Sequence, residues 1–433
     1  MTFKEWKNYW KKMNWTQKWF PVFILLRPIA DNFYFLKQVS PFISPLYILG
    51  ALIPLLIFFS FRTTKLHHKI PSGADGFMQT FGIVILVNCV FLLMYQFSLE
   101  NFGSVIKYLT PPLLFFYVRR FIQSKEDIVF LLQTFLYSCS FPFAILAFET
   151  FVHPLNPDYL SAGRGGGYRV HGAYSDCMNY AIYFIGAFLV YCYFFLGKVY
   201  AQKSLKEKLP SLKLIGMFLI CLGGLMAIRH VSTWAVFISI ICWMFLFNSK
   251  KMKGLIVVVF FGLVIVPFFA KSIYEKQIEP LLEKEISVVN GDAQIESAFN
   301  GRMSRWEKYF EVWNKMPVYT HFIGVSFSDF EEVPIMVGGG MHSDYVRVLF
   351  LTGFFGLTIY IVFILWVLSK RKNFRPPERF LILASVTSLL LYSVSTLPLN
   401  YIGFMQLILP VLAFALLPKK KIYSNESTIP VRK

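Results

Sequence analysis

Long apolar stretches separated by short polar segments run through most of the chain. A helix of about 18 to 25 apolar residues crosses a hydrocarbon core roughly 30 Å thick, and twelve stretches fit that description. They lie at approximately 19–36, 41–61, 77–98, 103–118, 128–151, 177–197, 214–228, 231–247, 254–270, 343–368, 380–397 and 401–417. The pattern therefore predicts an all-α integral membrane protein with about 12 transmembrane helices.

One long polar segment, 271–341, separates the ninth span from the tenth. Apolar residues at helical spacing in 273–289 predict an amphipathic helix on the membrane surface. A second helix is predicted over 301–316, where Pro317 stops it. The helix can therefore lie against the bilayer surface while it directs a guanidinium inward, because four of its side chains recur on one face: Arg302, Trp306, Tyr309 and Trp313.

Composition agrees with this pattern, because 56% hydrophobic residues is too apolar for a soluble protein of 433 residues. The net charge of +19 mainly reflects how the chain is oriented in the membrane. Most of the 43 lysines and arginines fall in the segments that are cytoplasmic if the N-terminus is inside, and Lys and Arg resist translocation. We therefore expect both termini in the cytoplasm and no nucleic-acid partner.

The chain then divides into five parts. These are a cytoplasmic amphipathic N-terminal segment (1–18), spans one to nine (19–270), a large external loop (271–341), spans ten to twelve (342–417) and a basic cytoplasmic tail (418–433). The six cysteines lie in or at the ends of spans without Cys-x-x-Cys spacing, which is typical of packing residues.

Several charged residues lie inside or beside spans. Arg27 and Asp31 share a helix face at i,i+4 spacing, which predicts a structural ion pair. Lys107, beside two prolines, predicts a kinked helix against a cavity, but the sequence supplies no partner for it. Arg229 lies in the very short connection between spans seven and eight, where it either reaches lipid headgroups or serves a site.

Candidate chemistry gathers between residues 300 and 356. Arginines at the outer edge of a membrane suit the phosphates of a lipid-linked substrate and the charge on a departing diphosphate. His342 directly precedes a helix, whose dipole favours the neutral imidazole that a general base requires. Gly338, Gly339 and Gly340 would let this loop move.

Other catalytic patterns are missing from the sequence. There is no Asp-x-Asp pair, no His-Glu-x-x-His, no phosphate-binding glycine loop of the P-loop type and no Gly-x-Ser-x-Gly. The acidic cluster Asp329, Glu331 and Glu332 is interpreted as a solvated turn. We therefore predict no metal site and no cofactor.

In their order along the chain, these residues resemble the O-antigen ligase and polymerase family of bacterial envelope polysaccharide synthesis. The late part resembles the family's Arg-x-x-x-Trp, Gly, His-Asn-x-Tyr/Leu and Gly-x-x-Gly pattern. Arg229 is similar to the arginine of its Ser-Arg-Gly motif, although Ile228 and His230 replace the small neighbours. The matching positions are Arg302 and Trp306, Gly324, His342 to Tyr345, Gly353 and Gly356, and, in mid-chain, Arg169, Gly172, Asn179 and Ala181.

The resemblance implies a GT-C-like membrane glycosyltransferase that uses no metal. It would transfer a glycan from undecaprenyl diphosphate to a sugar hydroxyl on the outer face of the bacterial cytoplasmic membrane. His342 would orient or deprotonate the acceptor hydroxyl, and Arg302 and Arg229 would hold the donor diphosphate. The supporting substrate-binding residues would be Arg169, Arg305, Asp344 and Tyr345. Membrane lipid, a chain-length regulator and a flippase would be its partners.

Two other functions stay open. A ligase would use the same residues but deliver finished polymer to a lipid A-core acceptor, and Ser343, where the family often has asparagine, favours a polymerase. A flippase or transporter also has many spans and intramembrane charges. An internal repeat and a site near the bilayer midplane are typical of that class, and the sequence predicts neither.

Overall fold

The computed structural model describes residues 1–40, 43–62, 72–95, 98–155, 169–201, 212–248, 286–288, 290–291, 298–324 and 340–419. Regular structure in these ranges is entirely helical. The helices are α1 (Phe3–Lys12), α2 (Trp15–Asn32), α3 (Leu36–Val39), α4 (Pro45–Arg62), α5 (Gly73–Tyr95), α6 (Leu99–Phe121), α7 (Lys125–Ser138), α8 (Ser140–Phe151), α9 (Cys177–Ala201), α10 (Leu212–Ile228), α11 (Val231–Asn248), α14 (Ala298–Lys315), α15 (Val318–Ile323), α17 (Asp344–Ser369), α18 (Pro376–Ser395) and α19 (Ile402–Ala415).

Helices occupy every predicted span except 254–270, which lies outside the described residues. Five helical segments among the described residues are long and apolar enough to cross a membrane, so the chain is an all-helical membrane protein. The total of twelve spans stays a prediction. The helix expected over 273–289 and the acidic cluster at 329–332 fall largely or wholly outside the described ranges.

Two of the predicted spans are interrupted. The span at 128–151 breaks at Cys139 into α7 and α8, and α17 is kinked at Gly353. All six cysteines are free and all but Cys242 are buried, which agrees with their interpretation as packing residues for those five.

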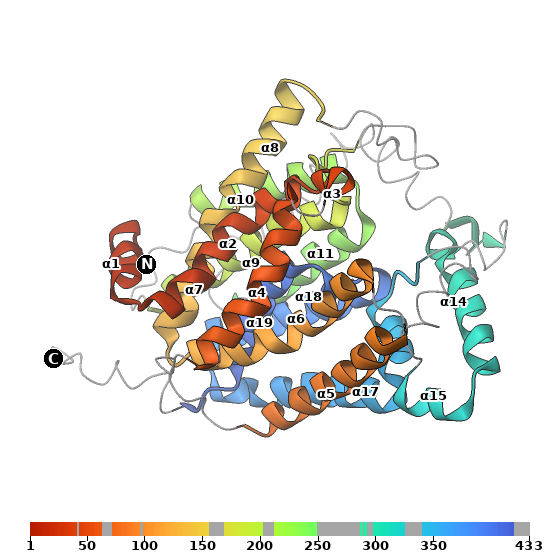
Figure 1. The fold of residues 1–433 in the computed structure, drawn as a ribbon. Helices are drawn as coiled ribbons and strands as arrows, with labels where there is room; N and C mark the ends of the chain where they lie inside the picture. Colours follow the sequence, from red (N-terminus) through yellow and green to blue (C-terminus); the bar gives the residue numbers. More distant parts are fainter. Residues whose placement is uncertain are drawn as a thin grey trace.

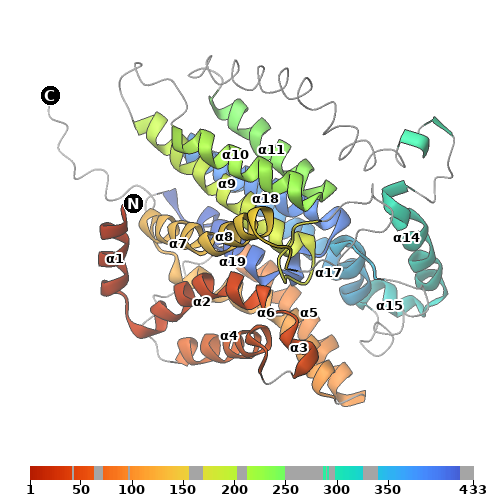
Figure 2. The same ribbon diagram turned by 90° about the horizontal axis from the view of Figure 1, so that it is seen from above.

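Helix α19 lies at the centre of the bundle, where α6, α7, α9 and α18 pack against it (Figures 1 and 2). All 14 of its residues are buried. Its sequence carries no charge and is apolar on every side, which suits a helix surrounded by other helices. The connection that leads into α19, residues 396–401, is thereby held at one end of the bundle.

The N-terminal helix α1 and the helix α14 lie at opposite ends of the molecule in both views (Figures 1 and 2). A capping box between Thr2 and Glu5 starts α1. Trp6 stacks on Phe130 of α7, and its indole Nε1 donates to Thr134 Oγ1 at 2.9 Å. The predicted amphipathic segment is therefore a short helix docked on α7, and it ends before residue 18.

The predicted second helix of the polar segment is present as α14. Part of its aromatic face packs on a neighbouring helix, and the position of α14 on the bilayer surface stays a prediction. Tyr309 and Trp313 are buried against Phe350 of α17, with ring centroids 5.6 and 4.7 Å apart. A stripe of aromatic residues packs equally well on lipid and on an apolar helix, so periodicity does not distinguish the two.

Two glycines join α15 to the kink of α17. Gly324 has φ of 97° and Gly353 has φ of 66°, a region that suits glycine. A Cβ on Gly353 would lie 2.2 Å from the carbonyl oxygen of Phe322, and one on Gly324 would lie 2.3 Å from that of Leu351. The two backbones therefore touch directly, and we call this contact the glycine clasp.

An asparagine completes the glycine clasp. The side-chain amide of Asn88, on α5, donates to the carbonyl oxygens of Leu351 at 2.7 Å and of Ile323 at 3.4 Å. The kink removes regular helical partners from these carbonyls, and a buried carbonyl without a partner is costly. The clasp thus fixes α15 against α17, and with it the position of α14 above the start of α17.

Candidate functional site

Two predicted site residues have an unusual backbone. Among the described residues, Arg229 (φ 52°) and His342 (φ 47°) are the only ones other than glycine with positive φ. Such a conformation is disfavoured for a branched or bulky side chain and persists only where the surrounding structure holds it. Arg229 lies between α10 and α11, and His342 lies just before α17. The strain motivates a functional hypothesis for both residues.

The His342 loop is held against α14. The indole Nε1 of Trp306 donates to the carbonyl oxygen of Met341 at 2.8 Å, and Arg302 lies one turn earlier on the same helix. The His342 side chain itself is exposed. The loop therefore presents an accessible imidazole beside the cationic face of α14.

Charges around His342 favour its neutral form. Partial burial of the ring lowers the pKa of His342, and the positive charges of Arg302 and Arg305 lower it further, while the Asp176 carboxylate opposes them. The direction agrees with the expectation from the sequence, and burial and the two arginines are its causes. A neutral imidazole at this place can accept a proton.

Arg169 and Arg229 form a second cationic group. The backbone N–H of Val170 donates to the carbonyl oxygen of Ala227 at 3.1 Å, which attaches the segment after Arg169 to the end of α10. Burial lowers the pKa of Arg229, and the charge of Arg169 lowers it further. The structure therefore brings together two arginines that the sequence placed about sixty positions apart.

The guanidinium groups of this pair lack complete partners. Within the described ranges, Nε and Nη2 of Arg169 and Nε of Arg229 are buried without a hydrogen-bond partner. Arg169 as a whole is only 8% exposed. A buried cation without a counter-charge is unfavourable, so the pair is suited to an anionic ligand.

The segment that follows Arg169 is fixed by buried polar contacts. The His171 side chain is buried, and its Nδ1 lies 3.2 Å from the carbonyl oxygen of Arg169. The N–H of Gly172, with φ of 60°, donates to Glu149 at 2.8 Å, and the N–H of Ala173 donates to Asn32 at 2.9 Å. Glu149 was not selected from the sequence, although a carboxylate in a span was a signal that could have found it.

Asp176 is a second residue that the sequence analysis missed. It precedes α9, where its Oδ1 accepts the N–H of Asn179 at 2.8 Å and its Oδ2 accepts the Tyr401 hydroxyl at 2.7 Å. Its charge acts on both His171 and His342. In the sequence only the turn-like residues 174–176 before a span pointed to it.

Asp344 and Tyr345 are engaged within the protein. Asp344 is fully buried, pairs with Arg347 at 2.8 Å, and accepts the N–H of Leu399 at 2.8 Å. Arg347 also donates to Asn400. The Tyr345 hydroxyl donates to the carbonyl oxygen of Leu390 at 3.1 Å. These contacts anchor the start of α17, and direct contact of either side chain with substrate stays a prediction.

The other intramembrane charges have structural partners. Arg27 and Asp31 form the expected ion pair at 2.7 Å, and the Tyr183 hydroxyl donates to Asp31 at 2.8 Å. The positive charge of Lys107 acts on Asp344.

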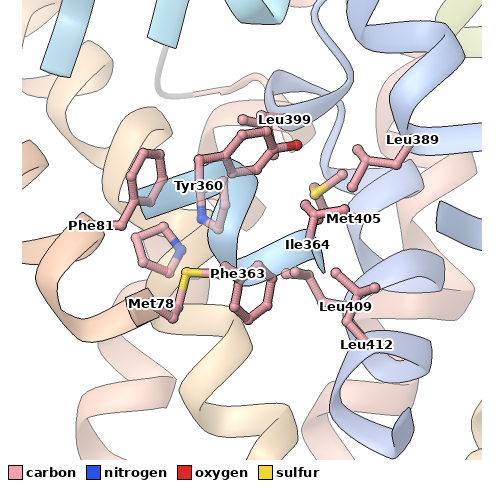
Figure 3. Close-up of a pocket in the computed structure, with 12 residues that line it drawn as sticks. Met78, Phe81, Tyr360, Phe363, Ile364, Leu389, Leu399, Met405, Leu409 and Leu412 are labelled. Carbon is pink, nitrogen blue, oxygen red and sulfur yellow. The ribbon is translucent and has the colours of Figure 1, made fainter. Parts of the chain in front are cut away.

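A narrow apolar cavity lies within the bundle beside the prolines of α6 (Figure 3). Its wall contains no charged side chain. The residues that line it are Met78, Phe81, Pro111, Pro112, Tyr360, Phe363, Ile364, Leu389, Leu399, Met405, Leu409 and Leu412. A cavity was predicted beside the two prolines, whereas a kink of α6 there stays a prediction; the lining of the cavity suits hydrocarbon rather than a sugar.

Comparison of the sequence with known protein families gives a match to part of the chain. A family model described as O-antigen ligase matches residues 216–361. No curated protein matches the chain. The matched part contains Arg229, Arg302 and His342, whereas Arg169 precedes it. No group of three metal-binding side chains lies together among the described residues.

Proposed function

Because residues 216–361 carry an O-antigen ligase family domain, we propose that this membrane protein is a polysaccharide polymerase. It transfers a glycan from undecaprenyl diphosphate to a sugar hydroxyl of a lipid-linked repeat unit, on the outer face of the bacterial cytoplasmic membrane. The family match supports a function of the ligase and polymerase type. The choice of polymerase is the finer part of the proposal.

The observation that carries the proposal is the Arg169 and Arg229 pair, with buried guanidinium nitrogens that have no partner among the described residues. A diphosphate offers several oxygens and two or more negative charges to such a pair. In the proposed site, Arg229 and Arg302 hold the donor diphosphate. Arg169 supports Arg229, and Arg305 supports Arg302.

His342 acts on the acceptor. The exposed, neutral imidazole takes the proton of the acceptor hydroxyl while that oxygen bonds to the anomeric carbon of the donor sugar. The bond from this carbon to the diphosphate breaks, and undecaprenyl diphosphate leaves with the electron pair. The arginines stabilise the charge that builds on it. The reaction needs no further reactant. The proton moves from the acceptor hydroxyl to His342, and the glycan moves from the diphosphate to the acceptor oxygen.

Asp344 and Tyr345 have a supporting part in this scheme. The ion pair with Arg347 and the N–H of Leu399 hold the start of α17 in place. His342 lies two residues before that point, so the same contacts hold the base. Ser343 is also buried and donates to the carbonyl oxygen of Ser393 at 3.0 Å, and its side chain thus supports the loop.

The test uses the full chain purified into nanodiscs, given a lipid-linked oligosaccharide repeat unit in the presence of a metal chelator. His342→Ala is compared with His153→Ala, which changes an exposed histidine outside the proposed site. A ladder of longer lipid-linked glycans that His342→Ala abolishes and His153→Ala retains supports the polymerase.

The other outcomes separate the alternatives. Transfer that takes place only after a lipid A-core acceptor is added would identify a ligase. Movement of the repeat unit across liposomes without a new glycosidic bond would identify a flippase and refute the enzyme. A ladder that His342→Ala makes at the normal rate would refute the role of this residue.

A further inference from the structure

The carboxylate of Asp176 is held at a fixed place beside the proposed site. Both of its oxygens accept hydrogen bonds, one from the N–H of Asn179 and one from the Tyr401 hydroxyl. The first contact is that of a helix N-cap, which explains why an aspartate can start α9. The second comes from the connection before α19 and has no part in capping.

That connection also holds the His342 loop. The N–H of Asp344 donates to the carbonyl oxygen of Thr396 at 3.1 Å, and the N–H of Leu399 returns to the Asp344 carboxylate at 2.8 Å. Residues 396–401 therefore contact Asp176 at one point and the residues after His342 at others. One short segment thus contacts both Asp176 and Asp344, and His342 lies two residues before Asp344.

The electrostatics of His342 call for an anion. Among the described residues, the charged groups that act on it are Arg302 and Arg305, from α14, and Asp176, from the start of α9. Of these only Asp176 is negative. A neutral imidazole that acts as a general base carries a positive charge once it has taken its proton, and the two arginines oppose that charge.

We propose that Asp176 is a positioning residue that acts through His342. Its carboxylate stabilises the imidazolium that forms when His342 takes the acceptor proton, and so offsets the charges of Arg302, which holds the departing diphosphate, and of its supporting neighbour Arg305. This inference rests on the proposed function. It explains how one small site serves both an anionic leaving group and a base that becomes cationic.

The test separates this role from capping. Asp176→Asn keeps a good N-cap and removes only the charge, whereas Asp176→Glu keeps the charge. Glu307→Gln is the matched control, because it removes one exposed carboxylate from α14. For each full-length variant in nanodiscs, the pKa of His342 is followed by NMR of ¹³C-labelled histidine, assigned with His342→Gln. Melting temperature and the pH dependence of kcat are measured on the same samples.

Asp176→Asn should lower the pKa of His342, because the negative charge of Asp176, which raises it, is lost. The acidic limb of the kcat profile should move to lower pH, and kcat on its plateau should fall about 10- to 100-fold, within the range of acid–base effects. KM and the melting temperature should change little. Asp176→Glu should recover part of kcat, and Glu307→Gln should match the unmodified protein in every measurement.

An unchanged His342 pKa and kcat in Asp176→Asn would reduce Asp176 to a helix cap and overturn the inference. A fall in melting temperature that accounts for the lost activity, with the pKa unchanged, would do the same. The NMR titration needs no substrate, so it reports the coupling of the two side chains even if no glycan ladder forms. In that case the proposed function fails, and the role in catalysis fails with it.

Discussion

The glycine clasp should be one of the least tolerant contacts in the protein, and Gly353→Ala tests it. Gly353 has φ of 66° and ψ of −173°, which is nearly exclusive to glycine. Forcing an alanine into such a region costs roughly 1–3 kcal/mol. A Cβ would also lie 2.2 Å from the Phe322 carbonyl oxygen, and relieving an overpacked contact costs about 1–3 kcal/mol more.

The expected loss is therefore about 2–6 kcal/mol in the free energy of unfolding, from these two contributions. The matched control is Gly223→Ala in α10, because no heavy atom lies within 4 Å of the Cβ that it would add. Alanine is the better helix former by up to about 1 kcal/mol, so the control should be neutral or slightly stabilising. Unfolding in nanodiscs or mild detergent, followed by tryptophan fluorescence, gives both values.

A double variant sharpens the test. Gly324→Ala should destabilise for the same reasons, since it presses on the carbonyl of Leu351. The two glycines lie in one contact. Either added methyl group already forces α15 away from α17, so the second one has less left to disrupt. The double variant with Gly353→Ala should therefore lose less than the sum of the single changes. An equal free energy of unfolding for Gly353→Ala and Gly223→Ala would refute the role of the glycine clasp.

Three further predictions concern charge. Arg302→Ala should raise the pKa of His342 and move the acidic limb of the polymerisation rate to higher pH, with a rate loss of about 10²-fold or more; a normal rate and profile would remove the role assigned to this arginine. Arg169→Met should raise the melting temperature of the substrate-free protein, because buried donors without partners cost about 1–3 kcal/mol, yet weaken undecaprenyl diphosphate binding about tenfold in a titration. Tight binding by this variant would argue against a diphosphate beside it. Asp75→Ala should cost about 3–5 kcal/mol in denaturant unfolding, because the substitution removes the carboxylate that lies 3.0 Å from the fully buried guanidinium of Arg119. A small loss would mean that water or another group replaces the carboxylate.

Local patterns in the sequence predicted most of the helices. An apolar run that satisfies its own backbone hydrogen bonds forms a helix wherever it lies in a membrane, so helices occupy the predicted positions in the described ranges, while the number of spans stays a prediction. The Arg27 and Asp31 pair is set by i,i+4 spacing, and α14 by its periodicity and by Pro317. His342, Arg302 and Arg229 were found by residue type and order, and their roles in a reaction stay predictions.

The tertiary structure decided which of these elements meet. The Asp176 carboxylate meets the hydroxyl of Tyr401, more than two hundred positions away in sequence. Tyr309 and Trp313 of α14 pack on Phe350 of α17. Lipid and protein interior are equally apolar, so hydrophobic periodicity predicts that a helix face is buried but not what buries it. Which distant segments form polar contacts depends on what buries each helix face. In this protein only the packing of the bundle decides that.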